Sequence, residues 1–139
     1  MSDHAFRGTP FHSATLARSE SPWWYAWGGY VVPDVYLDLH SELHTIRNNV
    51  AMLEMSPVPK MKITGADAKR FVNYLVTRDS DKMEVGYAWY TTWCNEDGKV
   101  IADGIAFYFE ENHFVLSGDR SSLAFKAKAE SFDVEITDI

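Results

Sequence analysis

Residues 87–109 read YAWYTTWCNEDGKVIADGIAFYF and give the clearest indication of the fold. Two runs rich in aromatic and apolar residues, 87–94 and 99–109, flank the short polar sequence NEDG at 95–98. Runs of this kind favour strands, and a glycine in the connection supplies the positive φ that a tight turn needs. The stretch therefore predicts an antiparallel β-hairpin.

The second run of this hairpin places an acid among apolar residues. Side chains of a strand alternate between its two faces, so the small residues Ala102, Gly104 and Ala106 share one face, where another element can pack closely. An unpaired carboxylate is costly to bury, and two interpretations of Asp103 follow. It is either a buried structural acid bonded to backbone amides or an arginine, or a ligand-facing group that accepts an N–H or transfers a proton. The face that carries this acid consists of Ile101, Asp103, Ile105, Phe107 and Phe109.

Two helices and a strand are predicted before the hairpin. Apolar residues recur at three-to-four-residue spacing over 35–48, which indicates a helix with Asp34 as its N-cap. A short strand is expected over 60–64. The sequence from Thr64 to Asp67 matches a capping box, so a second helix should begin there. Its apolar stripe consists of Ala68, Phe71, Val72, Leu75 and Val76.

The remaining elements complete an α+β pattern. A third strand is predicted over 113–117, a helix over 121–131 and a strand over 132–136. Helices interspersed with antiparallel hairpins indicate an antiparallel sheet, in hairpins and a meander, with helices packed on one face. The 139 residues suffice for one domain, and we predict an aromatic-rich lead-in over 1–33 followed by a single α+β domain over 34–139.

Composition and charge exclude several classes of partner. The chain has 13 basic and 20 acidic side chains and a formal net charge of −7, which gives no electrostatic footprint for nucleic acid or an anionic membrane. No apolar run reaches the roughly 18 residues that span a bilayer, and the start of the chain lacks the apolar core of a secretory signal. A cytoplasmic location is therefore expected, and the single cysteine, Cys94, fits a reducing compartment.

Other chemically interesting residues give weaker indications. His40 and His44 lie one helical turn apart, but the HExxH order and a third ligand are lacking, so we predict a solvated face and no metal site. Cys94 is outside any CxxC motif and is expected to be a packed thiol. The three tryptophans in the segment 23–27 could stack a planar ligand, or they could serve packing or an oligomer contact.

Several separate motifs carry a family resemblance. They are an apolar-acid-apolar-Ser segment at 53–56, a Gly-x-Asp-Ala helix start at Gly65, a Leu-x-Thr-x-Asp helix exit at Leu75, and Tyr-x-x-x-Cys-Asn-Glu-Asp-Gly at 90–98 followed by Asp103. Together they resemble the folate-binding N-terminal region of the glycine-cleavage T-protein (aminomethyltransferase) family. The upstream FHS and the Trp-rich segment resemble the branch that contains tetrahydrofolate-dependent O-demethylases and related methyltransferases.

The resemblance assigns roles to particular residues. It implies that Asp103 is the acid that contacts folate near its reactive nitrogens, and that Tyr90 lines the folate channel. Ala102 replaces the first acid of the family's Asp-Asp pair, which leaves Asp103 alone. The other positions implied to bind the cofactor are Val58, where the family often has methionine, Phe107, which replaces a second tyrosine, and Asp119 or Gly118, where an asparagine is usual.

The implied function is a tetrahydrofolate-dependent one-carbon transferase, or a fragment of one, that uses a small methyl or aminomethyl donor. Family members are far longer, and a single copy of this chain should leave one wall of the folate site open to water. Whether the chain is an enzyme by itself is therefore left open. A homo-oligomer or a complementary domain could complete the site. The alternative is a catalytically inactive truncated relative that acts as a folate-binding or protein-interaction module.

Overall fold

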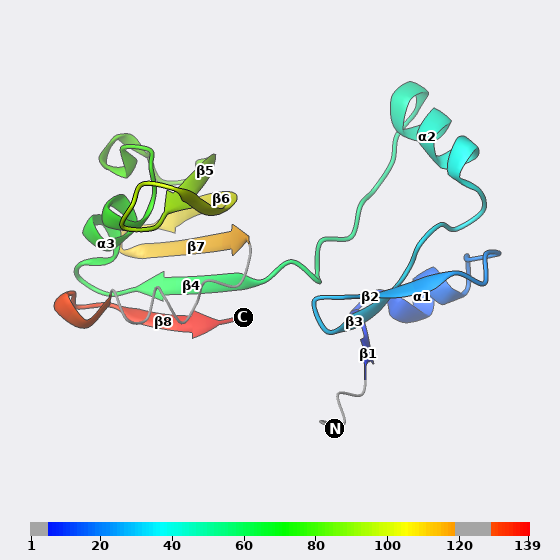
Figure 1. Ribbon diagram of the computed structural model, residues 1–139, viewed down its shortest axis with the longest axis horizontal. Helices are drawn as coiled ribbons and strands as arrows, with labels where there is room; N and C mark the ends of the chain where they lie inside the picture. Colours follow the sequence, from blue (N-terminus) through cyan, green and yellow to red (C-terminus); the bar gives the residue numbers. More distant parts are fainter. Residues whose placement is uncertain (1–5, 119–128) are drawn as a thin grey trace. The chain divides into compact units, whose positions relative to one another are not determined.

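A computed structural model of the chain describes residues 6–118 and 129–139 (Figure 1). Its contacts group the chain into two compact units, residues 1–57 and 58–139. In chain order the elements are β1 (Arg7–Gly8), α1 (His12–Leu16), β2 (Trp24–Trp27), β3 (Tyr30–Pro33), α2 (Leu39–Asn48), β4 (Lys60–Thr64), α3 (Ala68–Leu75), the 3₁₀ turn η1 (Ser80–Lys82), β5 (Ala88–Cys94), β6 (Val100–Glu110), β7 (His113–Gly118), the 3₁₀ turn η2 (Ala129–Ser131) and β8 (Glu135–Asp138).

The first unit contains a small sheet that the sequence pattern did not predict. Its strand order is β1-β3-β2, with β1 parallel and β2 antiparallel to β3. Gly28 and Gly29, both at positive φ, form the turn between β2 and β3, and a β-carbon on Gly28 would collide with the backbone of Pro57. The division of the chain into a lead-in of 1–33 and a domain of 34–139 stays a prediction; the grouping by contacts falls instead between Pro57 and Val58.

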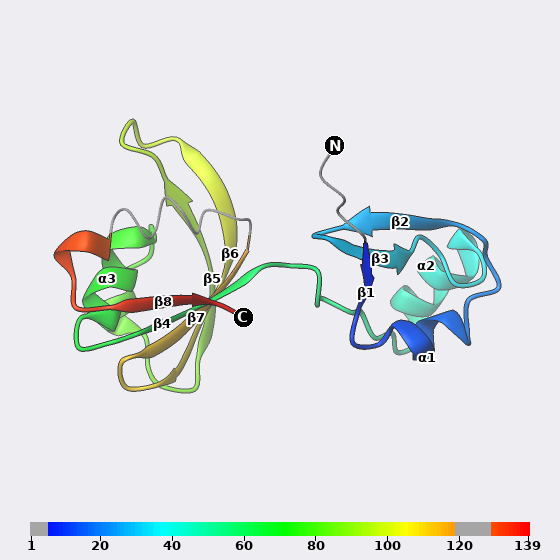
Figure 2. The same ribbon diagram turned by 90° about the horizontal axis from the view of Figure 1, so that it is seen from below.

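The second unit has the predicted α+β architecture. Its five strands run in the order β5-β6-β7-β4-β8, and every neighbouring pair is antiparallel. The hairpin of β5 and β6 and the third strand β7 lie where the sequence predicts them. Figure 2 shows α3 lying against one face of this sheet. The fold class is confirmed.

The core of the second unit lies between α3 and that face. The predicted apolar stripe of α3 is buried, with Phe71 and Val72 fully enclosed. Trp93 of β5 is also fully buried, and its ring covers Gly104 and Gly118, where an added β-carbon would lie only 2.9 and 2.6 Å from the ring. The small residues of β6 therefore face the core, as predicted, because a large ring packs on them.

Two predicted helix starts are wrong. Helix α2 begins at Leu39 rather than Val35, because Asp38 and not Asp34 is the N-cap and accepts hydrogen bonds from the backbone N–H groups of His40 and Ser41. The capping box at Thr64–Asp67 does not form: Asp67 precedes α3 without capping it. Its carboxylate instead accepts from the backbone N–H of Asp133 at 3.0 Å, which ties the start of α3 to the segment before β8.

The C-terminal elements also differ from the prediction. The last strand covers Glu135–Asp138 rather than 132–136. Phe132 and Val134 instead lie before the strand and pack against the core, where Phe132 meets the ring of Phe71 edge-on with centroids 5.1 Å apart. Most of the predicted helix 121–131 lies outside the described residues, and its last residues form the 3₁₀ turn η2.

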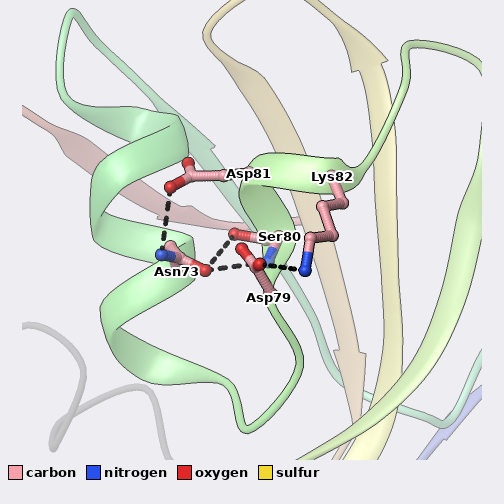
Figure 3. Close-up of polar contacts among 5 residues, drawn as sticks. All are labelled: Asn73, Asp79, Ser80, Asp81 and Lys82. Carbon is pink, nitrogen blue, oxygen red and sulfur yellow. Dashed lines mark hydrogen bonds and ion pairs between the residues drawn. The ribbon is translucent and has the colours of Figure 1, made fainter.

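A polar cluster joins the end of α3 to η1 (Figure 3). The Oδ1 atom of Asn73 accepts from the backbone N–H of Ser80 at 2.8 Å and from its hydroxyl at 3.3 Å. Asn73 also donates to Asp81 at 3.3 Å, and Lys82 forms an ion pair with Asp79 at 2.8 Å. Because Ser80 is buried, the Asn73 side chain satisfies polar groups that would otherwise be stranded in the core.

Candidate functional site

The face of the sheet opposite α3 carries the candidate site. The register places Tyr90 opposite Ile105, and Thr92 opposite Asp103, so these side chains share this face. Tyr90 is 62% exposed and Ile105 39% exposed, and Asp103 is exposed as well. The interpretation of Asp103 as a buried structural acid is therefore wrong. The reason is that the opposite face of β6, with its small residues, is the one that receives Trp93 and the core.

Tyr90 and Asp103 form a hydrogen-bonded pair across the hairpin. The phenolic O–H of Tyr90 donates to Oδ2 of Asp103 at 2.6 Å. This hydrogen bond is the largest cause of a raised pKa for the Tyr90 phenol, followed by desolvation and by the negative charge of Asp103. The phenol is therefore held in its neutral, donating form.

Tyr90 is in turn anchored through its backbone. Arg78 donates to the carbonyl of Tyr90 at 3.2 Å, and its guanidinium lies 4.3 Å from the ring centroid of Trp89. Thr77 and Thr92 join the same segments through a hydrogen bond between their hydroxyls at 2.9 Å. Sequence reasoning did not assign Arg78, Thr77 or Thr92 to the site. Thr77 was noted only as part of the Leu-x-Thr-x-Asp helix exit, and residues that follow a helix carry no periodic signal for the strand they meet.

Of the other predicted site residues, the structure describes Val58 and Phe107. Gly104 pairs with Gly118, and the backbone N–H of Gly118 donates to Pro59 at 3.0 Å, so the Val58–Pro59 segment lies at the same end of the sheet as Asp103. Val58 is half-buried there. Phe107 shares the face of Asp103 farther along β6, is half-buried and stacks on Phe109 with ring centroids 6.0 Å apart. Asp119 lies outside the described residues.

The arrangement offers defined chemistry to a ligand. One carboxylate oxygen of Asp103 is engaged by Tyr90, and the second can accept an N–H. The other residues on this face of β6, Ile101, Ile105, Phe107 and Phe109, are apolar or aromatic, which suits a flat heterocycle. The site can therefore bind a ring that carries N–H donors and hold it over the β5–β6 hairpin.

Residues 6–118 and 129–139 contain no group of three or more His, Cys, Asp or Glu side chains placed to hold a metal ion. His40 and His44 are exposed on α2, and Cys94 is a half-buried free thiol. Within the same residues, no helix has the length and apolar character needed to cross a membrane.

The second unit is thus an α+β fold with α3 on one face of its sheet and an acid–tyrosine pair on the other. Comparison with known proteins makes this specific. The chain belongs to the GCVT N-terminal domain family, whose model matches residues 11–139. The resemblance drawn from the sequence motifs is confirmed, whereas the closer likeness to the O-demethylase branch stays a prediction.

Curated relatives and a solved structure agree with this assignment. An aminomethyltransferase of Clostridium botulinum is 35% identical over 115 residues, which cover 79% of this chain and 31% of the relative. An aminomethyltransferase of Staphylococcus haemolyticus is 29% identical over 117 residues, covering 81% of this chain and 32% of the relative. The chain thus spans about a third of the length of these relatives.

The crystal structure of the glycine cleavage system aminomethyltransferase T from Bartonella henselae has a similar fold. It superposes with a TM-score of 0.79 at 19% identity and covers 97% of this chain and 38% of that protein. At this identity the likeness concerns the fold alone.

Proposed function

We propose that this chain forms the tetrahydrofolate-binding part of a one-carbon transferase of the aminomethyltransferase kind. The observation that supports it most is the Tyr90–Asp103 pair on the open, apolar face of the hairpin, in a chain of this family. Tetrahydrofolate presents a planar pyrimidine ring with N–H groups, and an apolar face with a carboxylate acceptor suits a ligand of that chemistry. The residues present therefore fit the cofactor.

Each proposed site residue has a distinct role. The free oxygen of Asp103 accepts an N–H of the pterin ring and holds the reacting nitrogen in register. Phe107 and Val58 give apolar contact, and Asp119 is retained as a polar contact on the sequence resemblance alone. Bound tetrahydrofolate would accept the one-carbon unit from a small methyl or aminomethyl donor, such as an amine, ether or sulfonium compound.

The length of the chain limits how much of a folate site it can form by itself. It spans about a third of its relatives, so a complete site would draw further walls from a second copy or from a complementary domain. We therefore propose binding by this chain and turnover only by the completed assembly.

Titration calorimetry with tetrahydrofolate tests the proposal. Wild-type protein should bind saturably, and Asp103→Asn should weaken binding about tenfold, which corresponds to about 1.4 kcal/mol. Asp97→Asn, in the exposed turn of the same hairpin, is the matched control and should leave the affinity unchanged. An absence of binding heat up to millimolar tetrahydrofolate would contradict the proposal.

A second candidate is a truncated relative that acts as a protein-interaction module. The observation in its favour is the exposed apolar surface of the hairpin, where Val100 is 64% and Phe109 56% exposed. Sedimentation velocity separates the two candidates. A concentration-dependent dimer that binds no tetrahydrofolate would favour the module, whereas a monomer that binds tetrahydrofolate would favour the first proposal.

A further inference from the structure

The hydroxyl of Tyr90 does more than line the candidate site, because it contacts the Asp103 carboxylate. Its hydroxyl reaches diagonally across the hairpin to Asp103, although its backbone is paired with Ile105. Among the side chains that the structure describes, Tyr90 is the one that donates a hydrogen bond to this carboxylate. We infer that Tyr90 is a positioning residue: its O–H fixes one oxygen of Asp103 and turns the other outward as the acceptor for an N–H of the bound heterocycle. The inference rests on the proposed function.

The need for such a residue follows from the surroundings of Asp103. An aspartate on an open strand can rotate about both side-chain torsions. Ile101 and Ile105 beside it are apolar, and the hydroxyl of its cross-strand neighbour Thr92 is paired with that of Thr77. A hydrogen bond of 2.6 Å from a phenol selects one orientation before the ligand arrives. The preorganised acceptor then loses less conformational entropy on binding.

The position of Tyr90 is itself determined by two contacts. Its strand pairs with β6, and the guanidinium of Arg78 donates to its carbonyl while lying over the ring of Trp89. Arg78 therefore helps to position the backbone of Tyr90, and the Tyr90 hydroxyl in turn positions the Asp103 carboxylate. Through these contacts, Arg78, which follows helix α3, influences the orientation of Asp103 on β6.

The positioning role requires a neutral phenol, since a phenolate cannot donate. The hydrogen bond to Asp103 raises the pKa of Tyr90, which keeps the phenol protonated at neutral pH. Among the described residues, Arg78 lies against the pair at the Tyr90 carbonyl. Lys60 of β4 is in the same cross-strand row, two strands beyond Ile105.

A double-mutant cycle on the whole chain tests the inference. Tyr90→Phe removes only the hydroxyl and should weaken tetrahydrofolate binding about tenfold, as expected for a hydrogen bond to a charged group. If Tyr90 acts through Asp103, then Tyr90→Phe combined with Asp103→Asn should bind no more weakly than Asp103→Asn alone. Tyr87→Phe, an exposed tyrosine just before β5, is the control and should leave binding unchanged. Additive losses in the double mutant would overturn the inference, because Tyr90 would then contact the ligand independently.

A measurement without ligand separates this inference from the proposed function. The Cζ resonance of Tyr90 in ¹³C-tyrosine-labelled protein should titrate at a lower pH in Asp103→Asn than in the wild type. An unchanged titration would show that the pair does not form in solution and would overturn the inference. A changed titration in a protein that binds no tetrahydrofolate would support the pair and overturn the proposed function alone.

Discussion

The Tyr90–Asp103 hydrogen bond should make the stability of the protein fall as the pH becomes alkaline. The pKa of Tyr90 is raised above 10.0 in the folded state by the hydrogen bond to Asp103, so the stabilisation is fully present below the unfolded pKa. It should be lost as the pH rises through the raised pKa, when a phenolate would face the carboxylate. Urea unfolding between pH 8 and pH 11 should therefore show a steeper loss of stability in wild-type protein than in Tyr90→Phe. Parallel curves for the two proteins would contradict this expectation.

Gly118 shows how closely the core approaches the sheet. A β-carbon there would lie 2.6 Å from the Trp93 ring and 2.5 Å from the carbonyl oxygen of Asp103. Gly118→Ala should destabilise the protein by about 1–3 kcal/mol, the usual cost of overpacking. The check is chemical denaturation, with Ser117→Thr as control, because it adds a methyl group at the next residue on the opposite face and should change stability by less than about 0.5 kcal/mol. An unchanged midpoint for Gly118→Ala would contradict the close packing.

At the scale of an element, the connection between α3 and η1 depends on one amide. Asn73→Ala would strand the backbone N–H and the hydroxyl of the buried Ser80 (Figure 3). The expected loss is about 1–3 kcal/mol, the cost of unsatisfied buried groups. Breaking the neighbouring ion pair with Lys82→Ala should cost less than about 1 kcal/mol because both partners are exposed. Equal effects of the two substitutions in thermal unfolding would argue against the buried role of Asn73.

Helix α3 should carry much of the stability of its unit through one face. Phe71 is fully buried and meets Phe132, whereas Tyr74 on the same helix is 57% exposed. Phe71→Ala should lower the free energy of unfolding by about 3–5 kcal/mol. Tyr74→Ala should cost much less, and guanidinium denaturation measures both. A similar loss for the two variants would mean that α3 does not pack on the sheet through the Phe71 side.

The sequence predicted elements best where one period or turn dominates. The hairpin and α3 followed directly from alternation, from the NEDG turn and from a helical stripe. The start of α2 was missed because the backbone N–H groups of Tyr36 and Leu37 are engaged by the carboxylate of Glu42, which keeps these residues out of the helix. The small sheet of the first unit was missed because its strands have four residues or fewer, too short for an alternation to be read.

At the scale of the whole molecule, the sequence proposed residues for the candidate site and a face of β6 where another element could pack, but it did not show what packs there. The family motifs singled out Asp103 and Tyr90, and the structure places them in contact. Alternation along β6 separates two sets of residues, and the small residues of one set indicated a face for close packing without naming the partner. That partner is Trp93, whose ring needs the glycines of β6 and β7 beneath it. The exposed position of Asp103 therefore followed from packing between strands, which no local pattern contains.

The two units should differ in their ability to fold alone. The buried apolar cluster, from Met61 through Trp93 to Leu116, lies entirely within residues 58–139. In the described part of the first unit, the buried apolar residues are Val32 and Pro57. Residues 58–139 produced alone should therefore unfold in one cooperative thermal transition, whereas residues 1–57 should show none, because so small a core does not offset the loss of chain entropy. Circular dichroism at far- and near-ultraviolet wavelengths measures both. A cooperative transition in residues 1–57 alone would show that the first unit has a sufficient core of its own, and the absence of one in residues 58–139 would show that the second unit depends on the rest of the chain.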